Sequence, residues 1–326
     1  MIKPIAITGG CGLVGSRVAK ALAEEGFPVV VLDKANPKER GVVFSNTVVF
    51  RQVDLRDREK TREAIRGSGT VLHFAANIGA LSYMHDHQAE IIADHSATDA
   101  SLYPALVAEG VSAVIYSSSS MVYERATRYP YTEEDLADIP PPKNIYGFSK
   151  LAGEYFCKSF SVQYGLPYTI VRYHNIYGPG EYSKGVSPGD IHVIPAIIEK
   201  VLSGQYPLRL LGGADATRPF TYIDDAVEAT VMVVKEVLLK NKKVMNTDFN
   251  IGPTKAIKIL DMAEKIWELL GDGRPFKYEV EDSKAASAIR REMDPSKIKS
   301  ILGWEAKVSL HEGIKKTSEW IKKQRQ

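Results

Sequence analysis

A glycine-rich turn between an apolar strand and a helix constrains the fold of this 326-residue chain more than any other feature. The apolar run 5–8 leads directly into the sequence GGCGLVG at 9–15, after which apolar residues recur at helical spacing until Gly26. Glycines allow backbone N–H groups to approach a phosphate, and a helix N-terminus carries partial positive charge. The pattern therefore predicts a site for a dinucleotide pyrophosphate, although a glycine turn without a ligand has the same local sequence.

An acidic residue, Asp33, ends the next apolar strand, which we expect at 29–32. A carboxylate at this place can accept hydrogen bonds from both hydroxyls of an adenosine ribose. Because it also repels a 2′-phosphate, NAD is favoured over NADP. The adjacent Lys34 leaves NADP open.

Strand and helix patterns continue to alternate after this unit. We expect further strands at 48–53, 70–74, 111–116 and 166–172, and helices at 59–66, 91–109 and 145–164. Repeated βα units of this kind predict an α/β fold, a doubly wound parallel sheet of the Rossmann type whose ligands gather at the C-terminal ends of the strands.

The pattern changes after residue 179 to loops rich in glycine and proline. Helices are expected at 191–202, 256–270 and 309–323, the last opened by a capping box of Ser309 and Glu312. These elements indicate a smaller α/β C-terminal lobe that closes over a substrate, while 222–238 and 248–251 return to the first domain as a helix and a strand. The expected domains are a dinucleotide-binding domain of residues 1–172 and 219–252 and a substrate lobe of residues 173–218 and 253–326.

A tyrosine and a lysine lie four positions apart in the expected helix at 145–164. Tyr146 and Lys150 would project from one helix face, so that the ammonium could lower the phenol pKa from its usual ~10 and make the phenol a usable base. A hydroxyl from the serine run 117–120 would complete a cluster around one substrate hydroxyl. Taken alone, such a pair is more often an ordinary exposed helix pair.

Composition excludes several other classes of protein. The 42 basic and 40 acidic residues nearly cancel to +2, which leaves no electrostatic footprint for nucleic acid. Two cysteines, Cys11 and Cys157, are too few for a disulfide scaffold and fit a cytoplasmic setting. No apolar run approaches the ~18 residues of a membrane span, and the histidines show no spacing typical of a metal site, so we expect neither membrane insertion nor a metal.

Several motifs together resemble the extended short-chain dehydrogenase/reductase superfamily, the NAD-dependent nucleotide-sugar epimerases and dehydratases. The resemblance rests on the glycine turn with Asp33, the Tyr-x-x-x-Lys pair and the serine run, and it covers essentially the whole chain in the right order. The other matching segments are Asp54-Leu55, HFAA at 73–76, RYHNIYGP at 172–179, TRPFTYIDD at 217–225, NIG at 250–252 and LGW at 302–304.

The resemblance implies NAD as the cofactor and a nucleotide sugar as the substrate. The residues implied to bind NAD are Gly9, Gly12, Leu13, Val14, Asp33, Asp54, Leu55, Phe74, Ala75, Ser117, Tyr146, Lys150, Tyr173 and His174. Those implied to bind the substrate are Ser119, Asn175, His192, Val193 and Arg218, with Arg291 replacing an Arg-Pro-Gly-Asp-like motif that is missing around Lys284. The usual asparagine of the helix after the fourth strand also has no match near Asp94 and His95. Family members are usually dimers through helices corresponding to 91–109 and 145–164, which implies a homodimer.

Met121 is the position that distinguishes the possible reactions. Dehydrating and decarboxylating members resemble one another in carrying an acid there, and 3,5-epimerases in carrying a cysteine, whereas a thioether neither gives nor takes a proton. The remaining chemistry needs Tyr146, Ser119, Lys150 and a nicotinamide. It is that of a nucleotide-sugar 4-epimerase, which acts on a UDP-hexose or UDP-uronate type of substrate through a transient 4-keto sugar.

Two alternatives stay open. A GDP-mannose 3,5-epimerase-like activity is indicated by the segments 77–80, 174–179 and 302–321, with Lys184 as a proton donor. A non-catalytic regulator that only binds NAD is the second. The nucleobase and the sugar depend on loop geometry, which the sequence leaves open.

Overall fold

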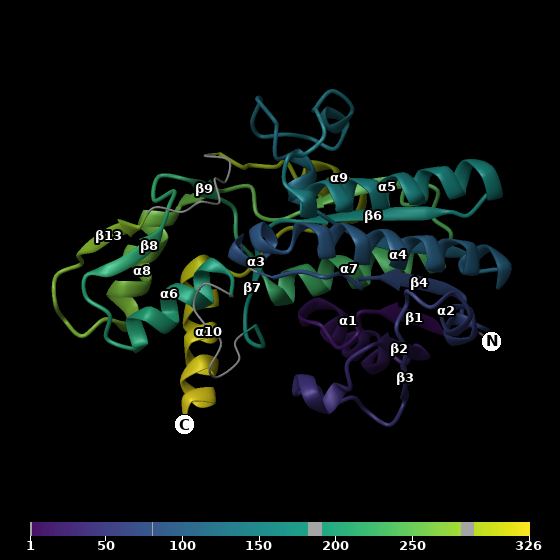
Figure 1. The fold of residues 1–326 in the computed structure, drawn as a ribbon, viewed down its shortest axis with the longest axis horizontal. Coiled ribbons are helices and arrows are strands. Elements are labelled where there is room, and N and C mark those ends of the chain that lie inside the picture. The colour runs from purple at the N-terminus through teal and green to yellow at the C-terminus, as the bar shows by residue number, and fades with distance from the viewer. Residues whose placement is uncertain (1, 80, 182–190, 282–289) are drawn as a thin grey trace.

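One parallel sheet forms the centre of the molecule in the computed structural model, which describes residues 2–79, 81–181, 191–281 and 290–326 (Figure 1). Its seven strands lie in the order β11-β6-β5-β4-β1-β2-β3 and are parallel throughout. They are β1 (Ile5–Thr8), β2 (Val29–Asp33), β3 (Val48–Gln52), β4 (Thr70–His73), β5 (Ala113–Ser119), β6 (Tyr168–Tyr173) and β11 (Thr247–Ile251). The predicted doubly wound α/β fold is confirmed.

Alternating strand residues bury the two faces of this sheet against different helices. Ile5 and Ile7 of β1 join one core with α1 (Leu13–Glu24) and α7 (Ile223–Leu238). Ala6, between them, joins the opposite core, whose helices are α2 (Arg58–Ile65), α4 (Gln88–Ala108) and α5 (Ile145–Tyr164). This period of two is what a strand buried on both faces requires, and it explains why the strands read as continuous apolar runs.

Helix α5 has the bounds that the sequence predicts because its end signals are local. The side chain of Asn144 accepts a hydrogen bond from the Gly147 N–H at 3.2 Å, and Gly165 ends the helix with a φ of 67°. In α10 (Leu310–Arg325) the Ser309 side chain likewise accepts from the Glu312 N–H, but the Glu312 carboxylate lies 2.8 Å from Lys316. The serine half of the predicted capping box is therefore confirmed, and Glu312 pairs with Lys316.

A second group of elements forms the smaller lobe beside the sheet, on the left in Figure 1. It contains α6 (Val193–Leu202), β8 (Leu208–Leu211), α8 (Ile259–Leu270), β13 (Tyr278–Glu281) and α10. Ile197, Ile266 and Ile314 are buried in its core. Helix α8 begins three residues later than predicted because β12 (Ile257–Lys258) pairs with β9 (Thr217–Arg218) in an antiparallel bridge.

The division into residues 1–172 with 219–252 and 173–218 with 253–326 remains a proposal. One segment of the second part packs on the first: Ile298 of α9 (Ser296–Leu302) and Trp304 are buried in the core with α7. The Trp304 indole donates to the Asp225 carbonyl at 3.2 Å. Within the described ranges, no helix combines the length and the apolar character needed to cross a membrane.

Candidate active site

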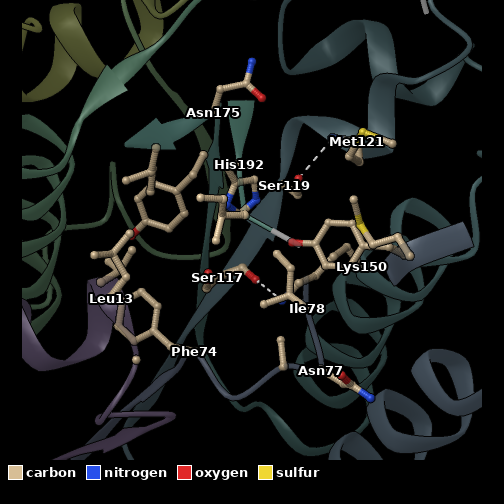
Figure 2. Close-up of a pocket in the computed structure, with 18 of the residues that line it drawn as sticks. Leu13, Phe74, Asn77, Ile78, Ser117, Ser119, Met121, Lys150, Asn175 and His192 are labelled. Atoms are coloured by element: carbon tan, nitrogen blue, oxygen red, sulfur yellow. Dashed lines mark hydrogen bonds between the residues drawn. The ribbon is translucent and has the colours of Figure 1, made fainter. Parts of the chain in front are cut away.

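A cavity of about 1090 Å³ runs from the C-terminal edge of the sheet to the lobe. Figure 2 shows residues of its lining, among them Leu13, Phe74, Ser119, Lys150 and His192. Every residue that the sequence assigns to the cofactor or the substrate lines this cavity, except His174. Segments more than 280 residues apart in the chain, Gly9 and Arg291, therefore meet in one place.

The glycine turn lies directly against the loop that follows β4. Gly9 has a φ of 63°, and a Cβ there would lie 2.6 Å from the Ala75 backbone nitrogen. A Cβ on Gly15 would lie 2.5 Å from the Gly9 carbonyl oxygen, so neither position has room for a side chain. The close packing keeps the turn and the α1 N-terminus at the cavity wall, a cradle that fits a pyrophosphate.

Asp33 is held at the end of β2 by two backbone donors. Its Oδ2 accepts from the Cys11 N–H and its Oδ1 from the Ala35 N–H, both at 2.9 Å. These bonds orient the carboxylate toward the cavity, and each oxygen retains capacity for a ribose hydroxyl. Asp54, another residue implied to bind NAD, is bound by Arg56, which holds the pKa of Asp54 down at about 2 and also reaches Asp94.

The strand β5 and the helix α5 bring Ser119, Tyr146 and Lys150 together. Residues 117 and 119 share one face of β5 because side chains alternate along a strand. The Ser119 hydroxyl is hydrogen-bonded to the Tyr146 side chain. The Lys150 ammonium donates to the Ser117 carbonyl at 2.8 Å and lies 6.0 Å from the centre of the Tyr146 ring.

Burial dominates the protonation of this cluster. It raises the pKa of Tyr146 to about 12, against the opposing effect of the Ser119 hydrogen bond. It lowers the pKa of Lys150 to about 8, against the favourable charges of Asp99 and Glu154. The expectation that Lys150 lowers the phenol pKa is thus wrong for this structure, because desolvation outweighs an ammonium that is bonded to the Ser117 carbonyl.

His174 is the one predicted site residue that the structure places elsewhere. Tyr173 lines the cavity with its ring and bonds the Thr230 side chain at 2.6 Å. His174 follows it and points the other way, fully buried, with Nε2 3.3 Å from the Tyr131 hydroxyl. Because successive side chains at the end of β6 point in opposite directions, Tyr173 and His174 cannot both face the cavity.

His95 is a site residue that the sequence does not reveal. Its Nδ1 lies 2.7 Å from the Ser149 hydroxyl, its Nε2 accepts from the Asn77 N–H at 2.9 Å, and its ring packs edge-on against Tyr146. Burial and the charge of Lys150 lower its pKa to about 4, which keeps the ring neutral. The sequence shows only that His95 lies one helical turn before Asp99 in α4. Its partners, Asn77 and Ser149, lie on two other segments, so their contact with His95 could not be predicted.

The lobe side of the cavity is cationic. Arg218 and Arg291 are both buried, and burial together with the charge of Arg291 lowers the pKa of Arg218 to about 9. His192 precedes the first turn of α6, and its ring pairs with the Glu181 carboxylate. Lys184 lies outside the described residues. In the described part of the chain, no group of three or more His, Cys, Asp or Glu side chains is placed to hold a metal.

A parallel sheet with a glycine cradle, a ribose-facing acid and a Ser, Tyr and Lys cluster in one cavity defines a nicotinamide-dependent enzyme of the short-chain dehydrogenase type. The family model described as "NAD dependent epimerase/dehydratase family" matches residues 5–252. The chain belongs to this family, and its cofactor is NAD. The relatives described next are sugar-nucleotide enzymes, as expected for this family.

Three similar proteins illustrate the range of the family. The UDP-N-acetyl-alpha-D-glucosaminuronate decarboxylase of Bacillus cytotoxicus is 32% identical over 99% of this chain and 98% of its own length. The GDP-mannose 3,5-epimerase of Arabidopsis thaliana is 29% identical over 98% of this chain and 82% of its own. The crystal structure of Thermotoga maritima UDP-glucose 4-epimerase with UDP-glucose has a TM-score of 0.85 at 27% identity, covering 99% of this chain and 100% of that one. Their different reactions show that membership alone does not fix the chemistry.

Proposed function

We propose that this protein is a nucleotide-sugar 4-epimerase that works through a transient 4-keto sugar. The observation that carries the proposal is the set of side chains around Tyr146. From Ser117 onward, the described residues that line the cavity include no carboxylate and no thiol. Met121 occupies the place next to the catalytic serine, buried beside Tyr146. Dehydration or removal of a carbon-bound proton needs a further acid or base, whereas reversible oxidation of one alcohol does not.

The residues of this chain would divide the work as follows. Tyr146 takes the proton of the C4 hydroxyl, and the Ser119 hydroxyl holds the same oxygen. When bound, NAD supplies the hydride acceptor and a positively charged ring beside the phenol, the charge that the high pKa of Tyr146 calls for. Lys150 binds the ribose next to that ring. After the keto sugar has turned over, Tyr146 returns its proton as C4 is reduced on the opposite face.

The substrate nucleotide would be anchored at the lobe while the sugar turns. Arg218, Asn175 and the N-terminus of α6 at Val193 provide positive charge and donors for a diphosphate. Because the anchor holds the diphosphate and not the sugar, the sugar stays free to present either face of C4.

A 3,5-epimerase is the second candidate because the Arabidopsis relative aligns along 98% of this chain. The thioether of Met121 opposes it. The two reactions differ in a direct readout: a 3,5-epimerase exchanges the protons at C3 and C5 with D2O, and a 4-epimerase exchanges neither.

The assay is proton NMR of UDP-glucose, UDP-glucuronate and GDP-mannose incubated with the protein and NAD, without any external reductant. We expect a mixture of 4-epimers from at least one of them. Failure to convert any of the three, with NAD bound, would favour the non-catalytic regulator.

We also propose that the protein is a homodimer through α4 and α5. Tyr155 and Val162 of α5 expose 61% and 90% of their surface, which is unusual for apolar side chains on one helix. Light scattering would give twice the 36.0 kDa chain mass for the dimer; a monomer at micromolar concentration would contradict it.

A further inference from the structure

One face of α4 carries a stripe of buried side chains. Ile91, His95 and Asp99 recur every four residues, and they expose 0%, 6% and 4% of their surface. Side chains at this spacing share one face of a helix. Ile91 packs with Tyr146 in a small apolar cluster, and the His95 ring meets the Tyr146 ring edge-on, with the ring centres 6.1 Å apart. His95 is therefore a buried polar side chain placed against the catalytic tyrosine.

Hydrogen bonds join His95 to two other segments. Its Nε2 lies 2.9 Å from the backbone nitrogen of Asn77, in the loop that follows β4. Its Nδ1 lies 2.7 Å from the Ser149 hydroxyl of α5. The Ser149 hydroxyl in turn donates to the Tyr146 carbonyl at 2.9 Å. Through one intervening side chain, His95 thus reaches the backbone of Tyr146.

One arrangement of protons satisfies all three bonds. Because Ser149 donates its single hydroxyl proton to the Tyr146 carbonyl, the Nδ1 of His95 must carry a proton and donate to the Ser149 oxygen. The unprotonated Nε2 then accepts from the Asn77 N–H, whereas the Asn77 carbonyl, 3.1 Å from Nε2, would accept a proton in the other tautomer. Burial and the charge of Lys150 lower the pKa of His95 to about 4, so the ring is neutral at neutral pH.

The loop at the other end of this chain of bonds is itself fixed to α4. The side chain of Asn77 donates to the Asp94 carboxylate at 3.0 Å and accepts from the Tyr83 hydroxyl at 2.9 Å. Two successive residues of α4, Asp94 and His95, therefore hold the same loop residue. Figure 2 shows Asn77 on the Lys150 side of the cavity. The anchored loop gives His95 a fixed point from which it can hold α5.

We infer that His95 is a positioning residue: acting through Ser149, it fixes the first turn of α5 and with it the Tyr146 hydroxyl that meets the substrate. The inference rests on the proposed 4-epimerase function. Tyr146 is the second residue of α5, where fewer intrahelical bonds hold the backbone than in the helix interior. Proton and hydride transfer depend on close alignment, and a displacement of about 1 Å can cost about 100-fold in rate. Support for this turn therefore acts on kcat, although His95 itself takes no part in the proton or hydride transfer.

A second bond between α4 and α5 provides a matched control. The Tyr103 hydroxyl lies 2.9 Å from the Cys157 sulfur, and both side chains are buried. Tyr103 follows His95, and Cys157 follows Ser149, by about two helical turns. This bond joins the same two helices at a distance from Tyr146.

The test compares His95→Phe, Ser149→Ala and Tyr103→Phe on the sugar nucleotide that the wild type converts. Turnover is divided by the amount of bound NAD, so that unfolded molecules do not count. We expect His95→Phe and Ser149→Ala each to lower kcat by about 10- to 100-fold, with KM changed less. The double variant should lose no more than the worse single variant, because both changes break one connection. Tyr103→Phe should keep kcat within about twofold even where its melting temperature falls.

Two conservative variants separate the two bonds of His95. In His95→Asn, the side-chain amide can take the place of Nδ1 and donate to Ser149, so most of kcat should return. In His95→Gln, the longer side chain places its oxygen near Nε2, where it can accept from the Asn77 N–H but leaves Ser149 without its donor. Better rescue by glutamine than by asparagine would overturn the route through Ser149.

The tautomer of His95 gives a readout that needs no substrate. Long-range nitrogen–proton NMR of the NAD-loaded, histidine-labelled protein distinguishes protonated from unprotonated ring nitrogens, and the His95 signals are those lost in His95→Phe. We expect the Nδ1–H form in the wild type. In Ser149→Ala, where Nδ1 loses its acceptor, we expect the Nε2–H form, which can donate to the Asn77 carbonyl.

Several results would overturn the inference. One is a His95→Phe variant that keeps more than about half of the wild-type kcat per bound NAD, and another is an equal loss in Tyr103→Phe. Losses that multiply in the double variant, or an Nε2–H tautomer in the wild type, would also contradict it. If the wild type converts no sugar nucleotide, the proposed reaction fails, and the tautomer alone then decides whether His95 holds the Tyr146 turn.

Discussion

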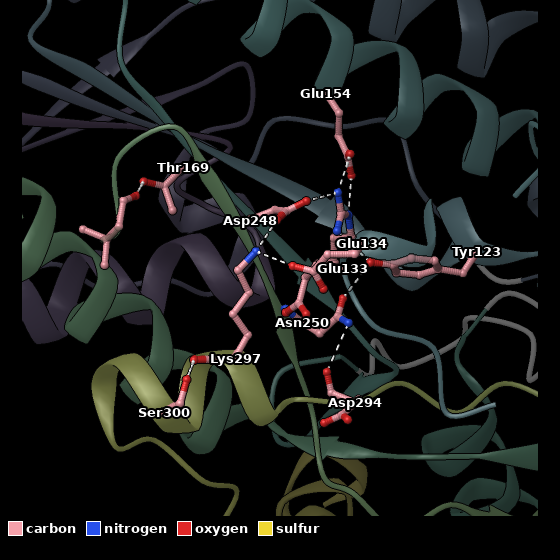
Figure 3. A network of polar contacts seen from close by, with 12 residues as sticks. Tyr123, Glu133, Glu134, Glu154, Thr169, Asp248, Asn250, Asp294, Lys297 and Ser300 are labelled. Atoms are coloured by element: carbon pink, nitrogen blue, oxygen red, sulfur yellow. Dashed lines mark hydrogen bonds and ion pairs between the residues drawn. The ribbon is translucent and has the colours of Figure 1, made fainter. Parts of the chain in front are cut away.

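Two buried polar regions flank strand β5 and helix α5, and they differ in how their charges are compensated. The first is the cavity with Tyr146 and Lys150. The second is a network centred on Arg172, which is fully buried on β6. Figure 3 shows its partners Glu154, Asp248 and Tyr123. The Arg172 guanidinium donates to both oxygens of Glu154 at 2.8 Å, to Asp248 at 2.6 Å and to the Tyr123 hydroxyl at 2.6 Å.

The serine run connects these regions. All residues from Ser117 to Ser119 line the cavity, and the Ser118 hydroxyl also donates to Glu154 of the network at 2.6 Å. Carboxylates raise the pKa of Arg172 well above its ordinary value, whereas burial lowers that of Lys150 to about 8. Burial is thus offset by paired charge in the network but only in part in the cavity. The reactive groups therefore lie in the region where the protein offsets the cost of burying charge only in part.

The largest expected effect is loss of turnover in Tyr146→Phe. Removal of the proton acceptor should lower kcat by about 10³-fold, within the range for general acid–base catalysis. Because the hydroxyl is bonded to Ser119 and not to the network, the melting temperature should change little. Conversion is followed by NMR and stability by calorimetry. A variant that keeps more than a tenth of wild-type kcat would remove Tyr146 from the mechanism.

Next in size is the loss of stability in Arg172→Met. Removal of the guanidinium leaves the buried Glu154 carboxylate uncompensated, so the free energy of unfolding should fall by about 3–5 kcal/mol. Urea denaturation measures it. Lys20→Met, on exposed α1 surface, is the matched control and should change stability by less than about 0.5 kcal/mol. Equal stability of both variants would show that the network is not a structural core.

Glu133 gives the network a dependence on pH. Burial raises its pKa from 4.5 to about 7, although it accepts from the Asn250 N–H at 2.6 Å. Between these values the folded protein binds more protons than the unfolded chain, so stability falls as pH rises from about 4.5 to 7. The fall should amount to about 3 kcal/mol and disappear in Glu133→Gln. Glu134→Gln, at an exposed neighbour, should keep it; a wild-type curve that rises through this window would contradict the shift.

The smallest effect concerns Ser119. Ser119→Ala removes one hydrogen bond to the reacting oxygen and to Tyr146, and kcat should fall by about 10- to 100-fold with KM changed less. Ser118→Ala is the matched control, because it should lower stability through Glu154 and leave the pH profile of kcat in place. Identical losses of kcat in the two variants would contradict a specific role of the Ser119 hydroxyl in the reaction.

Local patterns predicted most of the fold and the first half of the site. The glycine turn, Asp33 and the Tyr146–Lys150 pair are contiguous signals on single elements, and their geometry follows from helix and strand periods. The facing of His174 was not predictable, because it depends on where β6 ends; Asn175, just after it, has a φ of 35°. The contact between Met121 and Arg291 joins segments 170 residues apart, which only the folded lobe brings together.

The central claim is that C4 is oxidised and then reduced again, with NAD as the hydride carrier and Tyr146 as the acid–base group. Its most direct test is NMR of a substrate that carries deuterium at C4, incubated with NAD in ordinary water. The account predicts that both 4-epimers keep the deuterium at C4. Loss of the label to solvent, or entry of solvent hydrogen at C3 or C5 in the reverse experiment in D2O, would contradict it.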